Sequence, residues 1–259
     1  MILDDILAET RRTLVASRER APYAQIEKAA AAAASPRSLA QSLRKALGMA
    51  CIAEFKRRSP SKGWIHRDAD PVPVARAYEM AGAAGISVLT DTPFFGGSLD
   101  DLRRVRAAVG LPILRKDFLV DRYQVAEARA AGADAVLLIV AALGERDLGL
   151  LLAETARFGM EALVEAHDED EVRRAVTAGA QLIGVNHRDL RTFGMNMDLA
   201  ARMRPLIPPD RLLVAESGIK NAAEVGRLRG AGIDAILVGE TLMQAPDPAA
   251  ALRALVGGA

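Results

Sequence analysis

Cysteine, histidine and aromatic residues are all scarce in this chain of 259 residues. The single cysteine, Cys51, excludes a disulfide within the chain and is typical of a protein from the reducing cytoplasm. Because it falls at the start of the first predicted strand, we expect it to be a small core residue. The three histidines, His66, His167 and His187, lack the spacing of a metal-ligand pair, so we expect no zinc or other metal site.

An excess of charge of one sign is also missing, since 34 basic residues stand against 33 acidic ones. Nucleic-acid and anionic-membrane binding usually need a basic excess, so we expect neither partner and favour small molecules. The longest apolar run, Ala135 to Leu143, is far shorter than the ~20 residues of a membrane helix. Asp4, Asp5 and Glu9 stand where a secretory signal would be basic and then apolar, which predicts a cytoplasmic protein.

Residues 1-47 predict an N-terminal extension of two or three helices packed on the rest of the chain. Apolar residues recur at helical spacing from Ile2 to Leu7, and an alanine run extends from Ala29 to Ala34. Ser35 and Pro36 are predicted as the N-cap and first-turn residues of a further helix. A disordered tail is the alternative, chiefly for the alanine run.

From Gly48 onward, one pattern recurs four times: a glycine closes a helix and a continuous apolar strand follows. The copies are AGAAGISVLT, AGADAVLLIV, AGAQLIGVN and AGIDAILVGE, which start 50, 47 and 53 residues apart, at Ala81, Ala131, Ala178 and Ala231. One more apolar segment fits inside or before each interval: ACIAEF, PILRK, MEALVEA and RLLVAES. The pattern predicts eight strands with helices between them.

Eight βα units in residues 48-259 match the size of an α/β fold, the (β/α)8 TIM barrel. Continuously apolar strands fit the parallel sheet of such a barrel, which is buried on both faces. An open doubly wound sheet is the alternative. It is disfavoured because no G-x-G-x-x-G follows the first strand and because the units are even in length.

Chemistry in such a barrel takes place at the C-terminal ends of the strands. Six of the predicted ends carry candidate residues: Glu54 and Lys56, Lys116, Glu165, Asn186 and Arg188, Glu216 and Ser217, and Gly239 and Glu240. The first and sixth strands each offer a pair two residues apart, and such a pair lies on one side of its strand.

Lysine is rare, yet two of the six lysines, Lys56 and Lys116, stand at predicted strand ends. Arginine cannot release a proton at working pH, whereas burial or neighbouring positive charge can lower the pKa of lysine towards about 7 or 8. We therefore expect a titratable amine at these positions. The alternative is that each lysine only forms a structural ion pair with Glu54 or Glu165.

The segment PILRKDFLV places three consecutive charges at the end of the third predicted strand. Side chains alternate along a strand, so if Lys116 points into the barrel mouth, Arg115 and Asp117 point towards the surrounding helices. We interpret the charge of Lys116 as chemical and those of Arg115 and Asp117 as structural.

Glycines follow the seventh and eighth strands, at Gly218 and Gly239. Glycine lets backbone N–H groups approach an anion closely, and phosphate commonly binds at this place in barrel enzymes. The pair predicts a small phosphorylated substrate. The loop FFGGSLDD from Phe94 either covers an aromatic substrate or fills a gap beneath a helix.

Six segments occur here in the order typical of one family: IAEFKRRSPSKG, ILRKDFLV, LVEAH, GVNHRDLRTF, VAESGI and LVGETLM. With them the chain resembles indole-3-glycerol phosphate synthase, an enzyme family of tryptophan biosynthesis, over essentially its whole length. The strongest motifs are Ile52 to Gly63 and the Lys-Asp-Phe after the third strand. Two residues depart from the family's usual pattern, His187 in place of asparagine or serine and Trp64 in place of a smaller apolar residue.

The resemblance implies ring closure of 1-(2-carboxyphenylamino)-1-deoxyribulose 5-phosphate to indole-3-glycerol phosphate, with loss of carbon dioxide and water and with no cofactor. It implies that Lys116 is the general acid, that Glu165 is its carboxylate partner, and that Lys56 lies near the substrate's carboxylate. The other implied catalytic residues are Glu54, Asn186, Glu216 and Ser217. The implied substrate-binding residues are Arg188, Ser59, Phe95, Phe118, Gly218 and Gly239.

Other functions stay open on the residues alone. Lys116 could instead be the Schiff-base nucleophile of a phosphosugar aldolase, or the barrel could bind phosphate without catalysis. Phosphoribosylanthranilate isomerase is disfavoured because Cys51 lies at the wrong end of its strand. Monomer and homodimer are equally compatible with the sequence, and so are different assignments of the carboxylates to the proton-transfer steps.

Overall fold

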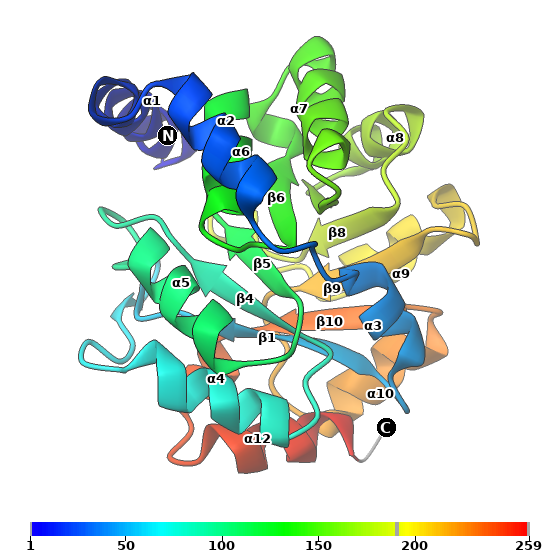
Figure 1. Cartoon of the computed structure of the whole chain (residues 1–259). Helices are drawn as coiled ribbons and strands as arrows, with labels where there is room; N and C mark the ends of the chain where they lie inside the picture. The colour runs from blue at the N-terminus through cyan, green and yellow to red at the C-terminus, as the bar shows by residue number, and fades with distance from the viewer. Residues whose placement is uncertain (1, 190–191, 258–259) are drawn as a thin grey trace.

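Eight parallel strands close into a barrel in the computed structural model of the chain, which describes residues 2–189 and 192–257. Around the barrel the order is β1, β10, β9, β8, β7, β6, β5 and β4 (Figure 1). The strands are β1 (Ala50–Phe55), β4 (Gly85–Leu89), β5 (Ile113–Lys116), β6 (Ala135–Ile139), β7 (Glu161–Ala166), β8 (Leu182–Asn186), β9 (Leu212–Glu216) and β10 (Ala235–Val238). The eight predicted strands and the TIM barrel are confirmed, and the open sheet is wrong.

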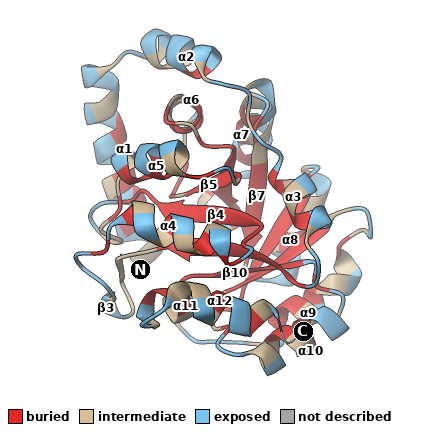
Figure 2. Cartoon of the chain, turned by 60° about the horizontal axis from the view of Figure 1, so that its bottom comes forward, coloured by how far each residue is buried: buried red, intermediate tan, exposed pale blue. Residues whose placement is uncertain are grey.

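The strands are buried on both faces, which explains their continuous apolar sequences (Figure 2). One cluster fills the barrel interior and includes Ile52, Leu114 and Leu163. The other lies between the strands and the helices and includes Cys51, which is 2% exposed, as expected of a core residue. Burial of this kind stabilises the fold by roughly 25 cal/mol for each Å² of apolar surface.

Helices surround the strands and link them in sequence (Figure 1). They are α4 (Pro71–Met80), α5 (Leu99–Ala108), α6 (Arg122–Ala130), α7 (Glu145–Arg157), α8 (Glu169–Thr177), α9 (Leu199–Met203), α10 (Ala222–Gly230), α11 (Glu240–Gln244) and α12 (Pro248–Val256), with short 3₁₀ turns at Val140–Ala142 and Arg204–Leu206. Side chains accept a first-turn N–H at the N-caps Asp70, Ser98, Asp121, Asp168, Asn221 and Asp247.

The recurring Ala-Gly pair marks the turn from a helix into the next strand. Its glycine has a positive φ in all four copies, for instance +94° at Gly132, a conformation that an L side chain rarely adopts. The next residue but one, such as Asp134, begins the approach to the strand, because the Asp134 N–H donates to the Ile113 carbonyl. The repeat in the sequence is therefore a repeated helix-to-strand turn.

Three helices precede the barrel, α1 (Ile2–Arg20), α2 (Tyr23–Ala32) and α3 (Leu39–Lys45), as the sequence predicted. Helix α2 includes most of the alanine run and packs along α6. The predicted start of the third helix is wrong. Its N-cap is Ser38, whose hydroxyl accepts from the Gln41 N–H, and the chain through Ser35 and Pro36 is not helical.

Arg37 explains why the chain stays extended before α3. Its backbone N–H donates to Asp134 Oδ1 at 2.8 Å, and its guanidinium donates to the carbonyls of Val109 and Leu111. These bonds tie the segment to the turns at the N-terminal end of the barrel. Over the described part of the chain, none of the helices combines the length and the apolar character needed to cross a bilayer.

Candidate active site

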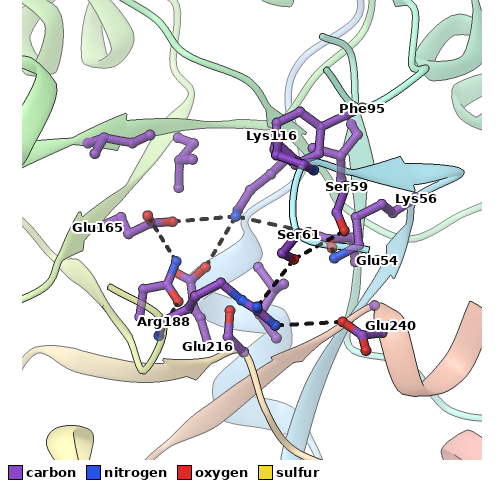
Figure 3. Close-up of a pocket in the computed structure, with 18 of the residues that line it drawn as sticks. Glu54, Lys56, Ser59, Ser61, Phe95, Lys116, Glu165, Arg188, Glu216 and Glu240 are labelled. Carbon is purple, nitrogen blue, oxygen red and sulfur yellow. Dashed lines mark hydrogen bonds and ion pairs between the residues drawn. The ribbon is translucent and has the colours of Figure 1, made fainter. Parts of the chain in front are cut away.

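The C-terminal ends of the strands surround a cavity that every predicted site residue lines (Figure 3). The carboxylates come from β1, β7 and β9, and Lys116 ends β5. A small antiparallel hairpin, β2 (Arg58–Ser59) and β3 (Gly63–Trp64), carries Ser59 to the cavity wall. Leu190 and Arg191 of the GVNHRDLRTF motif lie outside the described residues.

Lys116 lies at the centre of three buried carboxylates. Its Nζ is 3.3 Å from Glu216 Oε2, 3.4 Å from Glu165 Oε2 and 4.0 Å from Glu54 Oε2. Each of these glutamates is at most 3% exposed, and the lysine side chain is 14% exposed. Lys116 thus lies close to Glu54 and Glu165, as the alternative of a purely structural ion pair required. A structural pair needs only one acid, however, and Lys116 has three.

The expectation that the pKa of Lys116 is lowered is wrong. Burial lowers the pKa, but the negative charges of Glu165, Glu216 and Glu54 outweigh it, so the pKa is raised above its usual value. The amine is therefore a persistent cation. Sequence reasoning missed this because the three carboxylates come from strands far apart in the chain.

The pKa values of Glu165 and Glu216 are shifted in opposite directions, although both residues are buried beside Lys116. Burial favours the neutral acid in both, but Lys116 and the adjacent His167 ring hold the pKa of Glu165 well below its usual range. Glu216 has no hydrogen bond to either carboxylate oxygen from the described residues. Burial and the nearby Glu165 charge raise the pKa of Glu216 to about 8, although Lys116 opposes them.

Glu54 and Lys56 form the pair that the two-residue spacing predicted. Lys56 Nζ lies 2.9 Å from Glu54 Oε1, and both side chains line the cavity. Burial of Glu54 is outweighed by the charges of Lys56 and Lys116, which lower the pKa of this carboxyl. Glu54 is therefore a carboxylate at neutral pH.

His167 is a neighbour of the site that sequence reasoning overlooked. Its Nε2 lies 3.2 Å from Glu165 Oε1, and its Nδ1 lies 3.2 Å from Glu171 Oε2. Burial lowers the pKa of His167, but the adjacent carboxylates of Glu165 and Glu171 outweigh burial and raise it to about 10. The signal was present, because His167 stands two residues after Glu165 in LVEAH.

Asn186 and Arg188 also lie on one side of their strand end, as predicted. Asn186 Nδ2 donates to Glu165 Oε1 at 3.2 Å, and the Arg188 N–H donates to Asn186 Oδ1. The Arg188 guanidinium donates to Ser61 Oγ at 3.2 Å and lies 3.6 Å from Glu240 Oε2 (Figure 3). Ser61, two residues after Ser59 on the same loop, had not been predicted.

Aromatic and aliphatic side chains form the apolar wall of the cavity. The rings of Phe95 and Phe118 are 6.1 Å apart between centroids and tilted by 36°. Asp91 Oδ1 accepts the backbone N–H groups of Phe94 and Phe95, which fixes the loop that carries Phe95. Ile2, Leu3 and Ile6 of α1 also line the cavity, a contribution that helical spacing alone could not locate.

Gly218 and Gly239 line the same cavity as the polar groups. Gly218 has a φ of +77°, and a Cβ there would lie 2.4 Å from the Met195 Cε atom. Gly239 precedes α11, and a Cβ there would lie 2.4 Å from Glu54 Oε1. The positive φ favours glycine at position 218, and the close contact with Glu54 favours it at position 239.

Arg115 and Asp117 point away from the cavity centre, as alternation predicted. The Arg115 guanidinium donates to Glu127 of α6, to the Gln124 carbonyl and to Asp117 Oδ2. The Asp117 carboxylate also accepts from the Thr90 hydroxyl and from the Phe118 N–H. This buried network fixes the direction of the strand end on which Lys116 stands.

The described residues contain no group of three or more histidine, cysteine, aspartate or glutamate side chains able to hold a metal ion. The reactive groups present are two lysine cations, three carboxylates of unequal pKa and two glycines beside an apolar wall. This set can donate and accept protons and bind an anion. The fold and the site therefore define a (β/α)8-barrel enzyme of general acid–base chemistry.

Comparison with known proteins identifies the family. The family model for indole-3-glycerol phosphate synthase matches residues 3–255. The chain is 51% identical over 256 residues to indole-3-glycerol phosphate synthase 2 of Streptomyces coelicolor, covering 99% of each chain. It is 48% identical to the synthase of Koribacter versatilis over 98% of each chain, and 49% identical to that of Mycobacterium avium over 98% of this chain and 93% of the other.

The chain belongs to the indole-3-glycerol phosphate synthase family. Indole-3-glycerol phosphate synthase activity, a carboxy-lyase reaction of tryptophan biosynthesis, follows from this membership. Both the resemblance and the function it implied are confirmed.

Proposed function

We propose that the barrel mouth closes the indole ring of 1-(2-carboxyphenylamino)-1-deoxyribulose 5-phosphate, with Lys116 as the general acid. The observation that carries this assignment is the position of Lys116 Nζ within 4.0 Å of three buried carboxylates. Ring closure requires an aromatic carbon to attack the sugar ketone, whose oxygen becomes negatively charged. A fixed cation at that oxygen stabilises the transition state.

The raised pKa of Lys116 suits this role. The ammonium does not lose its proton to bulk water at neutral pH, so it is charged when the substrate arrives. The developing alkoxide is a far stronger base than water and accepts the proton once the new bond forms. The neighbouring carboxylates stabilise the charge of the lysine until that point and hold its Nζ in place.

Lys56 is assigned to the substrate's carboxylate. It is a compact cation held by Glu54 at 2.9 Å, and it lines the same cavity as Lys116. Holding the carboxylate beside the ring orients the carbon that attacks the ketone and from which carbon dioxide then leaves. Positioning of this kind needs a point charge and no proton transfer.

Glu165 is assigned the removal of protons during dehydration and restoration of the aromatic ring. Lys116, His167 and Asn186 hold it as a carboxylate, so it is unprotonated when the substrate binds. Glu216 has a raised pKa and can supply or share a proton with Glu165. Glu54 is the remaining candidate base, and Ser217 follows Glu216 at the cavity wall.

The substrate's phosphate is assigned to Gly218 and Gly239, and its aromatic ring to the wall formed by Phe95 and Phe118. Arg188 and Ser59 complete the polar contacts. Binding energy from the phosphate, which takes no part in the chemistry, can thus fix the orientation of the reacting atoms. Neither Lys116 nor its carboxylates requires a cofactor for these steps.

We assign residues 48-259 to the catalytic barrel and residues 1-47 to an extension that completes the cavity wall through α1. A cytoplasmic location is part of the proposal and fits the lone cysteine. The Schiff-base aldolase is less well supported, because a nucleophilic amine must be neutral and the three carboxylates favour the cation at Lys116.

The test adds the carboxyphenylamino sugar phosphate to purified protein without any cofactor and follows the appearance of indole fluorescence. Turnover by wild type that is lost in Lys116→Met supports the proposal. A folded wild-type protein that forms no product contradicts it. Trapping of a substrate adduct on Lys116 with borohydride would favour the aldolase instead.

A further inference from the structure

His187 is buried behind the proposed phosphate site and takes no part in the assignments above. It is 1% exposed, and it follows Asn186, so alternation turns its ring away from the cavity that Asn186 lines. Its Nδ1 lies 3.0 Å from the carbonyl oxygen of Ser217. The backbone of His187 is fixed as well, because its N–H donates to the Glu216 carbonyl and its carbonyl accepts from the Asn196 N–H.

The contact with Ser217 determines how the ring is protonated. A carbonyl oxygen can only accept a hydrogen bond, so Nδ1 must carry the proton. Burial lowers the pKa of His187, which keeps the ring neutral and leaves Nε2 without a proton. Nε2 is buried and has no hydrogen-bond partner among the described residues. Within this part of the chain, the hydrogen bond from Nδ1 to Ser217 is therefore the only one that the ring makes.

Ser217 needs such a contact. Its φ is +66°, one of two positive values among the described residues other than glycine. A side chain in this region strains the backbone, and surrounding interactions must hold it there. Gly218 follows with a φ of +77°, so the chain turns sharply at the point where it lines the cavity.

The peptide between Ser217 and Gly218 connects the histidine to the cavity. In a planar trans peptide, the C=O of one residue and the N–H of the next point in opposite directions. His187 binds the Ser217 oxygen on the outer side of the strands, so the Gly218 N–H points inward. The described residues supply no acceptor for this N–H, which leaves it available to an anion in the mouth.

We propose that His187 is a positioning residue that aims the Gly218 N–H at the phosphate of the substrate by holding the Ser217 carbonyl from behind. This inference deepens the function proposed above and depends on its phosphate site. Loss of the Nδ1 donor lets the peptide rotate. The protein then binds the phosphate more weakly, while the groups around Lys116 keep their places.

Three variants separate this role from packing. His187→Asn retains a donor nitrogen the same number of bonds from Cα, His187→Gln carries the same amide one bond further out, and His187→Leu has no donor. We expect KM to rise about 3- to 10-fold in the glutamine and leucine variants, the effect of one lost hydrogen bond, with kcat nearly unchanged. His187→Asn should have a KM within about twofold of that of the wild type. Circular dichroism and thermal melts check that each variant folds.

Binding of inorganic phosphate, followed by phosphorus NMR line broadening, measures the same contact without turnover. Weaker phosphate binding in His187→Gln than in His187→Asn supports the proposal even if the wild type fails to close the indole ring. A folded glutamine or leucine variant with wild-type KM and phosphate affinity overturns it. So does a loss confined to kcat, which would place His187 with the acid–base groups.

Discussion

Gly239 and Glu54 lie in such close contact that a Cβ atom on the glycine would be 2.4 Å from the Oε1 atom of the glutamate. Real Cβ atoms essentially never approach another atom this closely, so a side chain at position 239 must displace the carboxylate. Glu54 in turn pairs with Lys56 and lies 4.0 Å from Lys116. A change at Gly239 in the proposed phosphate site would therefore also move Glu54 among the proposed acid–base groups.

Gly239→Ala should impair both binding and turnover. Loss of close backbone approach to the phosphate raises KM by about tenfold, and displacement of Glu54 lowers kcat, by up to roughly 100-fold for a shift of one ångström. Steady-state kinetics resolve the two effects.

Gly226→Ala in α10 is the matched control, since its Cβ would meet nothing within 4 Å. It should leave kinetics unchanged and stabilise the fold by about 0.5–1 kcal/mol. Unchanged KM in Gly239→Ala would remove Gly239 from the phosphate site.

Lys116→Met and Lys116→Arg should both lower kcat by about 100-fold or more, with a modest change in KM. Methionine keeps the length of the side chain but removes the cation. Arginine keeps the charge but cannot give up a proton at working pH. Indole fluorescence in single turnovers measures the step directly. Near-wild-type turnover in either variant would exclude Lys116 as the general acid.

The barrel could be predicted from the sequence because each strand is a short apolar run of consecutive residues. Before four of the strands an Ala-Gly pair stands directly ahead of the apolar run, and neighbouring strands then align so that Asn186 pairs with Glu216 in register. The start of α3 was missed because it depends on Arg37 reaching Asp134, a contact 97 residues distant.

The electrostatics of the site could not be predicted in the same way. The pKa of Lys116 is set by Glu54, Glu165 and Glu216, and only folding brings these residues to one point. The sequence identified the lysine and each acid but not their separations, on which the sign of the shift depends. The contribution of α1 to the cavity likewise follows from its tertiary position.

Glu216→Gln should stabilise the protein increasingly as the pH rises. The pKa of Glu216 is about 8 in the folded state, against about 4.3 in an unfolded chain, so folding retains a proton between these values. Wild type therefore loses stability as the pH rises from about 4 to 8, and the neutral glutamine removes this loss. Urea unfolding of both proteins at pH 5 and pH 8 measures the difference. A difference independent of pH would mean that Glu216 ionises normally.

His167→Gln should shift the acid limb of the kcat/KM profile to higher pH. The pKa of His167 is about 10, so its ring is a cation at neutral pH, and with Lys116 it holds Glu165 as the carboxylate. Glutamine can still donate a hydrogen bond but carries no charge, so the pKa of Glu165 rises while Asn186 and Glu216 face it as before.

The activity of His167→Gln should consequently be close to wild type at pH 8 and fall below it as the pH is lowered towards 5. Rate profiles over this range measure the shift. Glu171→Gln is the matched control, because it leaves the histidine in contact with Glu165 and removes only the second carboxylate, which contacts Nδ1 at 3.2 Å. Its acid limb should move less, because it weakens the histidine cation without removing it. Coincident acid limbs in wild type and His167→Gln would show that Lys116 alone keeps Glu165 ionised.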